Sequence, residues 1–165
     1  MWHTKFARAL IGAGVETAVW IPDKRLSPIA EALTAEGLRL RTLTREEECI
    51  AYAAGYRAAG GMPLVLMQSS GLGNSLNAIG SLAIPYGLGF PLIISMRGTL
   101  GEQNPAQVPV GRSVTEFLGL LGVQCFPLRA PEQIPGIVVG ALNTARGARQ
   151  VAPITLESDL DFRLE

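Results

Sequence analysis

Three consecutive carboxylic acids, Glu46, Glu47 and Glu48, form the longest acidic run in this sequence of 165 residues. A carboxyl group that a fold partly buries can hold a proton near neutral pH, because burial raises its pKa, and can then act as a general acid or base. Acids in the first turn of a helix also have a structural role, since the helix dipole favours negative charge there. Thr44 is the expected N-cap, with Glu47 at the capping-box position three residues later. A solvated cap therefore accounts for two of the three carboxylates and leaves one for chemistry.

The elements that position these acids follow from the alternation of apolar and helical patterns along the chain. We expect helices over residues 2–13, 28–35, 45–59, 71–82, 113–121 and 131–146, and strands over residues 16–21, 38–43, 63–68, 92–96, 123–127 and 152–156. The two central strands are almost continuously apolar, which is typical of parallel strands covered on both faces. The alternation predicts an α/β protein, a three-layer α/β/α arrangement with an open parallel sheet of about six strands, and a single domain over residues 1–165.

Ligands of such sheets bind at the carboxyl ends of the strands, where the start of the acidic helix and three further polar segments are expected. These segments are residues 22–24, 68–74 and 97–107. The Gly-rich part of the second segment predicts a tight turn that lets a flat ring approach the backbone, although its spacing is neither Gly-x-Gly-x-x-Gly nor a Lys-bearing P-loop. The polar stretch 99–111 is expected to be a functional loop. Its candidate side chains are Glu102, Gln103 and Gln107.

The overall composition excludes several classes of function. Fourteen basic and fourteen acidic residues cancel, so we expect no binding to nucleic acid or to an anionic membrane surface. No apolar run is long enough to span a bilayer and no signal peptide opens the chain, so a cytoplasmic protein is expected.

Cys49 and Cys125 lack metal-ligand spacing and are expected to be reduced core residues. His3 is the sole histidine, which argues against a Ser-His-Asp or Cys-His nucleophile system.

Three segments in a fixed order carry a resemblance to a known family. Arg45-Glu46 precedes Gly55-Tyr56, then comes Met67-Gln-Ser-Ser-Gly-Leu-Gly-Asn-Ser, and then Ile94-Ser-Met-Arg-Gly. Over about residues 19–128 the chain resembles the pyrimidine-binding (PYR) domain of thiamine diphosphate enzymes. It most closely resembles the family of sulfopyruvate decarboxylase alpha subunits, and phosphonopyruvate decarboxylase is a similar enzyme.

The resemblance implies a cofactor and the residues that hold it. Glu46 is implied as the acid that contacts N1′ of the aminopyrimidine ring of thiamine diphosphate, where a carboxyl group favours the imino tautomer that removes the cofactor's C2 proton. The activated cofactor then attacks a 2-oxo acid and holds the negative charge left when carbon dioxide departs. The residues implied beside the ring are Ser70, Gly71, Leu72, Gly73 and Asn74.

The substrate implied by the resemblance is a small anionic 2-oxo acid. Conversion of 3-sulfopyruvate to sulfoacetaldehyde is expected first, and phosphonopyruvate is the second candidate substrate. The cations Lys24 and Arg97 would suit a carboxylate and a sulfonate, and Arg25 competes with Lys24 for this role. The other expected substrate residues are Pro22, Asp23 and Gln68.

The sequence contains one half of the expected cofactor site. Thiamine diphosphate enzymes hold Mg²⁺ through a Gly-Asp-Gly…Asn segment in a pyrophosphate-binding (PP) domain, whereas Asp23, Asp159 and Asp161 do not follow glycine here. The resemblance implies that a beta subunit carrying the PP domain binds Mg²⁺ and completes the site in a hetero-oligomer, with a homo-oligomer expected for the chain alone. Two alternatives remain: a non-catalytic scaffold or regulatory subunit of the same fold, and a flavodoxin-like nucleotide binder.

Overall fold

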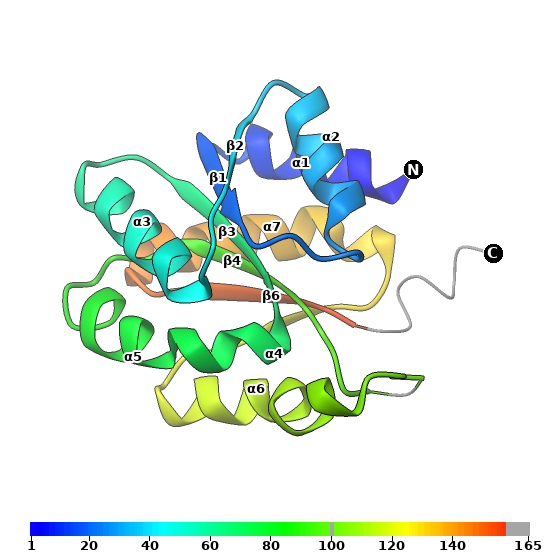
Figure 1. Cartoon of the computed structure of the whole chain (residues 1–165). Helices are drawn as coiled ribbons and strands as arrows, with labels where there is room; N and C mark the ends of the chain where they lie inside the picture. Colours follow the sequence, from blue (N-terminus) through cyan, green and yellow to red (C-terminus); the bar gives the residue numbers. More distant parts are fainter. Residues whose placement is uncertain (100, 158–165) are drawn as a thin grey trace.

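Six parallel strands form one sheet at the centre of the computed structural model, which describes residues 1–99 and 101–157. The strand order is β2-β1-β3-β4-β6-β5, and each neighbouring pair is parallel (Figure 1). The strands are β1 (Thr17–Trp20), β2 (Arg39–Thr42), β3 (Pro63–Gln68), β4 (Pro91–Ser95), β5 (Phe126–Leu128) and β6 (Ala152–Leu156). The predicted α/β class and the predicted six-stranded parallel sheet are confirmed.

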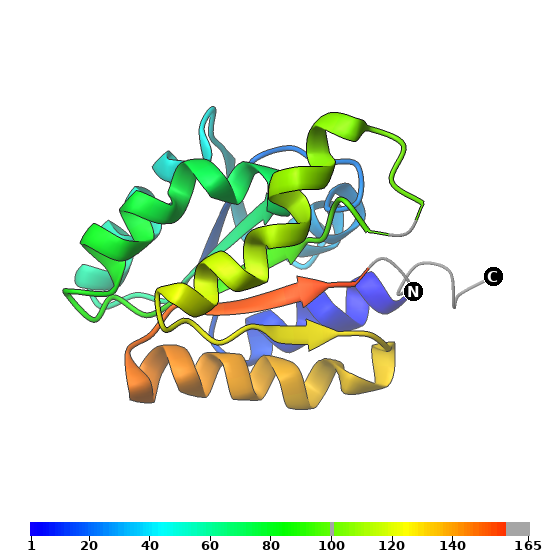
Figure 2. The same cartoon turned by 90° about the horizontal axis from the view of Figure 1, so that it is seen from below.

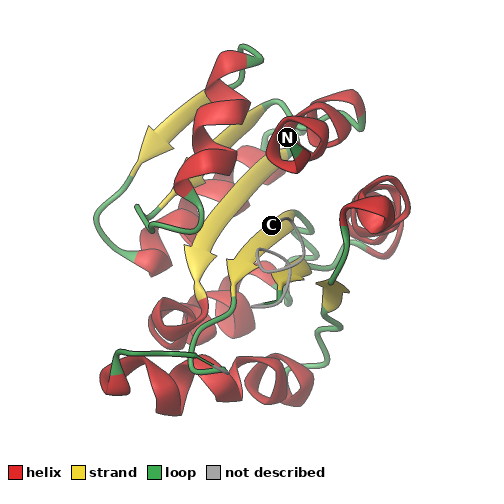
Figure 3. Ribbon diagram, turned by 90° about the vertical axis from the view of Figure 1, so that its right-hand side faces the viewer, coloured by secondary structure: helices red, strands yellow, loops and turns green. Residues whose placement is uncertain are grey.

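Helices cover both faces of the twisted sheet and give the three expected layers (Figure 2, Figure 3). One face carries α1 (Trp2–Gly12), α2 (Ser27–Ala35) and α7 (Ile134–Asn143). The other face carries α3 (Glu46–Ala58), α4 (Ser69–Leu72), α5 (Leu76–Ala78) and α6 (Val108–Leu120). Shorter 3₁₀ turns are η1 (Gly73–Ser75), η3 (Pro105–Gln107) and η4 (Pro131–Gln133), and π-helical turns are η2 (Ile79–Ala83) and η5 (Thr144–Ala148).

The side chains of β3 show how the sheet serves both layers. Leu64 and Leu66 are buried in the core beneath α1, α2 and α7, whereas Val65 and Met67 are buried in the core beneath α3 to α6. Full burial of a side chain of this size contributes roughly 1.5–3 kcal/mol. The central strands are therefore firmly packed on both faces, and their carboxyl ends give a rigid base to the segments that follow them.

The helix after β3 differs from the sequence-based prediction. It begins at Ser69, before the predicted start at residue 71, and continues to Ala83 through α, 3₁₀ and π turns. The Gly-rich segment 69–74 is therefore helical, and the prediction of a tight turn was wrong. The change of direction occurs one residue earlier, at Gln68, whose extended backbone (φ −80°, ψ 154°) joins the strand directly to the helix.

The helix that follows β4 also begins earlier than expected. Helix α6 starts at Val108 after the 3₁₀ turn η3, so the predicted loop 99–111 was wrong for its second half. Pro105 and Pro109 suggested an irregular segment, but each stands in a first turn, where a missing N–H group and a fixed φ cause no loss. Asn104 supplies the cap, because its Oδ1 accepts a hydrogen bond from Ala106 N at 3.1 Å.

The connection order places a switch point at the carboxyl ends of β1 and β3, which is the usual position of a ligand-binding crevice. From β1 the chain moves outward through α2 to β2, and α3 then carries it back to β3 on the other side of β1. A reversal of this kind in a parallel sheet opens a ligand-binding crevice above the two central strands. The residues after β1, the start of α3 and the residues after β3 meet at this place. Within residues 1–99 and 101–157, no helix is both long and apolar enough to cross a bilayer.

Candidate functional site

The first turn of α3 is held by a carboxylate, although by a different one from that predicted. Arg45 is the N-cap residue in place of Thr44, and Glu48 in place of Glu47 reaches back to it. Glu48 Oε2 accepts hydrogen bonds from Thr44 Oγ1 at 2.9 Å, from Thr44 N at 3.2 Å and from Arg45 N at 3.2 Å. These bonds, above all that from the Thr44 hydroxyl, hold the pKa of Glu48 below its usual value. Glu48 is therefore a structural cap.

Glu47 lies beside the cap and uses one of its two carboxylate oxygens. Glu47 Oε1 accepts a hydrogen bond from Arg45 Nε at 2.6 Å. Hydrogen bonding to the helix backbone and to Arg45 keeps the pKa of Glu47 below its usual value. Glu47 Oε2 is buried and has no hydrogen-bond partner among the described residues.

Glu46 points across the crevice to the helix after β3. A Cβ built on Gly71 would stand 2.6 Å from Glu46 Cδ and 2.8 Å from Glu46 Cγ, so the carboxyl group occupies the space that a side chain at position 71 would fill. The side chain of Glu46 is half-buried. Within residues 1–99 and 101–157 it has no hydrogen bond or ion pair. A half-buried carboxyl group without a protein partner is a candidate for contact with a ligand.

The residues predicted beside the cofactor ring fall on α4 and η1. Gly71 is buried against Glu46, as described above. The Leu72 side chain is fully buried in the core of this layer and is therefore not available to a ligand. Gly73 lies close to α6, since a Cβ there would stand 3.2 Å from Val110 Cγ1. Ser70 is half-buried and Asn74 is exposed.

Asp23 is the centre of a polar network at the ends of β1 and β4. Its Oδ1 accepts hydrogen bonds from Ser95 Oγ at 3.0 Å and from Arg25 N at 3.1 Å. Its Oδ2 lies 3.6 Å from Arg97 Nη1, and only 7% of its side chain is exposed. Arg97 N in turn donates to Ser69 Oγ at 2.8 Å. The network therefore joins the predicted substrate segments after β1, β3 and β4.

Glu102 is the strongest partner of Arg97. The distance from Arg97 Nε to Glu102 Oε2 is 2.9 Å, and that from Arg97 Nη2 to Glu102 Oε1 is 3.4 Å. Glu102 also accepts hydrogen bonds from Asn104 N at 2.9 Å and Gly98 N at 3.3 Å. These bonds, first that from Asn104, lower the pKa of Glu102. The sequence suggested Glu102 as a ligand-facing side chain, whereas the structure shows it closing its own loop and, with Asp23, balancing the charge of Arg97.

The remaining predicted substrate residues lie around this network. Lys24 and Pro22 are exposed after β1, and Gln68 is half-buried at the end of β3. Lys24 forms no ion pair with the described part of the chain, so its charge faces solvent. Arg25, the competing cation, donates to Met96 O at 2.7 Å and to Glu157 O at 3.0 Å and so joins the ends of β4 and β6.

The two cysteines and the histidine have structural positions. Cys49 is buried and Cys125 is half-buried, and both thiols are free, as predicted. The His3 ring packs on the Trp2 ring, with 4.0 Å between the ring centroids, and the residue is half-buried. The described residues contain no group of three or more His, Cys, Asp or Glu side chains that could hold a metal ion.

Comparison with known proteins identifies the family. Residues 3–106 match the family described as thiamine pyrophosphate enzyme, N-terminal TPP binding domain. The chain is 41% identical over 120 residues to sulfopyruvate decarboxylase subunit alpha of Methanothermobacter thermautotrophicus, covering 72% of this chain and 71% of that one. It is 35% identical over 152 residues to the protein of the same name from Methanococcus maripaludis, covering 92% and 91%. It is also 33% identical over 117 residues to phosphonopyruvate decarboxylase of Streptomyces hygroscopicus, covering 70% of this chain and 29% of that one.

A solved structure shows the same fold at lower sequence similarity. The chain superposes on 2-oxoglutarate:ferredoxin oxidoreductase from Magnetococcus marinus with a TM-score of 0.72 and 17% identity, over 93% of this chain and 28% of that one. The family match and the sequence relatives point to the same group of proteins. The chain therefore belongs to the thiamine pyrophosphate enzyme family, of which it is an N-terminal TPP-binding (PYR) domain, and within it to the group of sulfopyruvate decarboxylase alpha subunits.

Proposed function

We propose that this protein is the PYR-domain subunit of a thiamine diphosphate-dependent decarboxylase that converts 3-sulfopyruvate to sulfoacetaldehyde and carbon dioxide. The proposal depends on one observation above all. Glu46, in a chain of this family, presents a half-buried carboxyl group that has no partner among the described residues and lies over Gly71. Relatives named sulfopyruvate decarboxylase subunit alpha support the choice of substrate.

The residues around Glu46 fit the aminopyrimidine end of the cofactor. Because Gly71 lacks a side chain, the Glu46 carboxyl group lies directly against the backbone of α4. Glu46 is near enough to that backbone for its carboxyl group to meet a ring nitrogen placed there. We assign to Ser70, Gly71, Leu72, Gly73 and Asn74 the task of forming this wall, through backbone atoms where side chains are buried.

The chemical task of Glu46 is to hold a proton at N1′. Thiamine diphosphate, when bound, supplies a carbon nucleophile and accepts the electrons released with carbon dioxide. A hydrogen bond between the Glu46 carboxyl group and N1′ would draw electron density from the ring and make the exocyclic amino group more acidic, so that its nitrogen could lose a proton and then serve as the base. Glu48 cannot do this, because three hydrogen bonds tie its carboxylate to the helix cap.

The acid groups of the substrate need a cation near the same edge. Arg97 is balanced by Asp23 and Glu102, so we assign it mainly to holding the loop after β4. Lys24 forms no ion pair with the described part of the chain, and it lies next to Asp23 on the segment after β1. We therefore assign the sulfonate or carboxylate of the substrate first to Lys24, with Pro22 and Gln68 bordering it. Phosphonopyruvate, with one more ionisable oxygen, is the second candidate substrate, because a phosphonopyruvate decarboxylase is among the relatives.

A second subunit is expected to supply the diphosphate end of the site. The described residues contain no candidate metal cluster, and the relatives are named as alpha subunits. We propose that a beta subunit carrying a PP domain binds Mg²⁺ and the diphosphate and covers the crevice.

The direct test is an assay of the chain with and without its beta subunit. We expect decarboxylation of 3-sulfopyruvate only when both subunits, thiamine diphosphate and Mg²⁺ are present, with a lower kcat/KM for phosphonopyruvate and pyruvate. Full turnover by this chain alone would refute the shared site. A higher kcat/KM for phosphonopyruvate would refute the choice of substrate. A complex that assembles but decarboxylates none of the three would favour a scaffold role.

A further inference from the structure

Three arginines line one cavity at the amino-terminal edge of the sheet, opposite the edge that carries Glu46. The cavity has a volume of about 600 Å³ and receives Arg57 from the end of α3 and Arg146 and Arg149 from η5 and the residue after it. These residues lie immediately before β3 and β6, and the segment 86–88 before β4 completes the wall. A volume of 300–1,000 Å³ is usual for small-molecule sites.

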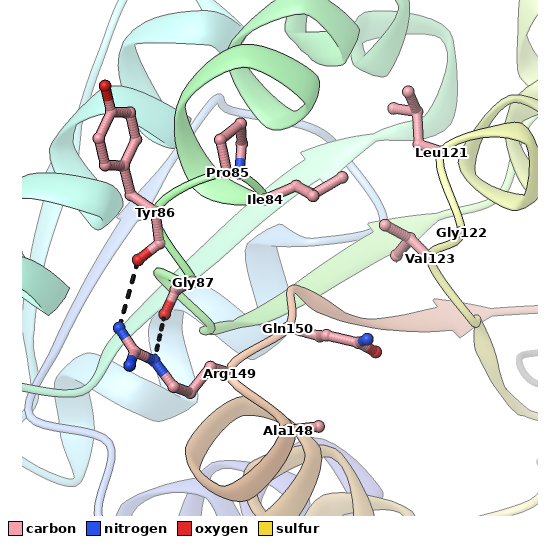
Figure 4. A pocket seen from close by; sticks show the side chains of 10 residues that line it. All are labelled: Ile84, Pro85, Tyr86, Gly87, Leu121, Gly122, Val123, Ala148, Arg149 and Gln150. Atoms are coloured by element: carbon pink, nitrogen blue, oxygen red, sulfur yellow. Dashed lines mark hydrogen bonds between the residues drawn. The ribbon is translucent and has the colours of Figure 1, made fainter.

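Each guanidinium group is fixed by backbone carbonyl groups and not by acids. Arg149 Nε donates to Gly87 O at 3.2 Å and Arg149 Nη2 donates to Tyr86 O at 3.3 Å (Figure 4). Arg57 Nε donates to Gly89 O at 2.9 Å, so two arginines from distant segments hold the same loop. Arg146 Nη2 donates to Ala13 O at 2.6 Å. Because a guanidinium group carries five N–H donors, each arginine keeps donors for another partner.

The positive charge of this cluster is not balanced by side chains. No acidic residue lines the cavity, and none of the three arginines forms an ion pair within the described ranges 1–99 and 101–157. Glu16, an acid on the same edge, has its two carboxylate oxygens occupied by Met62 N at 3.0 Å and Tyr56 Oη at 3.4 Å. Helices α1, α3 and α7 with η5 end here, as does the helix after β3 that ends at Ala83, and a helix C-terminus contributes about half a negative charge. Four such ends offset about two of three full positive charges, so the cavity keeps a net positive charge.

The backbone at Arg149 is unusual for a residue with a side chain. Arg149 has φ 56° and ψ 38°, and it is the one non-glycine residue with positive φ in the described chain. The left-handed conformation is unfavourable for an ordinary residue, and glycine is the usual choice at a helix end of this kind. The arginine stands between the cavity of about 600 Å³ and the adjacent one of about 420 Å³ shown in Figure 4.

We propose that this arginine-lined cavity binds a small phosphorylated molecule that also carries a flat ring, as a nucleoside phosphate does. Arginine binds phosphate well because its planar donors match two oxygens at once. Tyr86, 66% exposed, and the neighbouring Leu82 and Leu88 supply an apolar wall for the ring. The cavity lies at the edge of the sheet remote from Glu46, so its ligand does not compete with the proposed cofactor site.

Titration calorimetry of the full chain, without thiamine diphosphate, tests the proposal with pyrophosphate, ADP and ATP as probes. The variants are R149G, which removes the guanidinium group and suits the left-handed backbone, and R57Q. The control R112Q removes an exposed charge of α6 that is remote from the cavity. We expect saturable binding that weakens with salt, at least tenfold weaker binding in R149G and in R57Q, and unchanged binding in R112Q and E46Q. Since the measurement does not depend on turnover, it can fail or succeed independently of the proposed decarboxylation.

Each outcome decides a part of the proposal. Tighter binding of ADP than of pyrophosphate supports a phosphorylated ligand with a ring, whereas equal binding of the two refutes the part of the proposal that concerns the ring. No saturable binding of any probe, or equal binding by wild type and an R57Q/R149G double variant that keeps its circular dichroism spectrum, overturns the site. Loss of binding in E46Q would place the probes in the crevice and would also overturn it.

Discussion

The carboxyl group of Glu46 lies against the backbone of Gly71, in the space that a side chain at position 71 would occupy. The two residues come from different connections, one between β2 and β3 and the other after β3. The parallel sheet brings them together because both connections reach its carboxyl edge. The Glu46 side chain can therefore take this position only because residue 71 is a glycine.

The substitution Gly71→Ala tests this relationship. Gly71 is in a helical segment, where alanine is favoured over glycine by about 1 kcal/mol, so the fold should tolerate the change. The added methyl group should displace the Glu46 carboxyl group. Since a shift of about 1 Å at a catalytic group can cost about 10²-fold in rate, we expect kcat of the assembled enzyme to fall by roughly ten- to a hundredfold.

The matched control for this variant is Gly136→Ala in α7, where a new Cβ would meet no atom within 4 Å. Both variants should unfold at temperatures close to that of the wild type, and only G71A should lose activity. Wild-type kcat in G71A would show that the position of Glu46 over Gly71 is unimportant.

The loop after β4 should be stabilised by the charge of Glu102. Its hydrogen bonds with Asn104, Gly98 and Arg97 lower its pKa in the folded state below the ordinary value of 4.5. A carboxylate with a depressed folded pKa stabilises the protein above the ordinary pKa, and that stability is lost as the pH falls through the folded pKa. We therefore expect E102Q to melt at a lower temperature than the wild type at pH 7 and the difference to shrink below about pH 4.5.

Thermal unfolding followed by circular dichroism between pH 3 and pH 8 measures this difference. Glu31→Gln on α2 is the control, because Glu31 is exposed and has no hydrogen bond or ion pair with the described part of the chain. Equal melting temperatures of E102Q and the wild type at pH 7 would mean that the loop does not depend on this carboxylate.

The two thiols should react slowly in the folded chain. Burial raises the pKa of Cys49 to about 12 and that of Cys125 to about 11, from an ordinary value of 9.0. Because the thiolate is the reactive form, alkylation at pH 8 should be slower than in the urea-unfolded chain by about two orders of magnitude at Cys125 and about three at Cys49. Timed iodoacetamide labelling with peptide mass spectrometry measures both rates. Labelling of Cys49 as fast as in the unfolded chain would mean that its side of the core opens readily.

The sequence was sufficient to predict the elements whose side chains carry a simple period. The apolar runs of β3 and β4 and the small-residue helix α3 were placed correctly, and the edge of the sheet at which Glu46 lies followed from the order of the elements. The start of α6 could not be placed, because prolines such as Pro105 and Pro109 occur both in loops and in the first turn of a helix.

The partners of individual side chains were beyond prediction from the sequence. The bond from Arg97 to Glu102 was not foreseen, since a cation near a sheet edge can bind a ligand or a neighbouring acid. The cap at α3 moved by one residue because Glu48, not Glu47, has the geometry to reach Thr44. The cluster of Arg57, Arg146 and Arg149 arises only when three chain segments converge before β3, β4 and β6.

The activity of the Glu46→Gln variant in the complete complex is the most direct test of the proposed function, with Glu47→Gln as the matched control. Both changes replace one carboxyl group in the first turn of α3 with an amide, but only the first removes the carboxyl group that lies over Gly71. Proton transfer by a positioned side chain contributes about 10²–10⁴-fold to a rate, so E46Q should lose at least a hundredfold in kcat on 3-sulfopyruvate, while E47Q keeps most of it and both still bind thiamine diphosphate. If E46Q in the assembled complex turns over at the wild-type rate, Glu46 is not the acid of this site and the proposed mechanism is wrong.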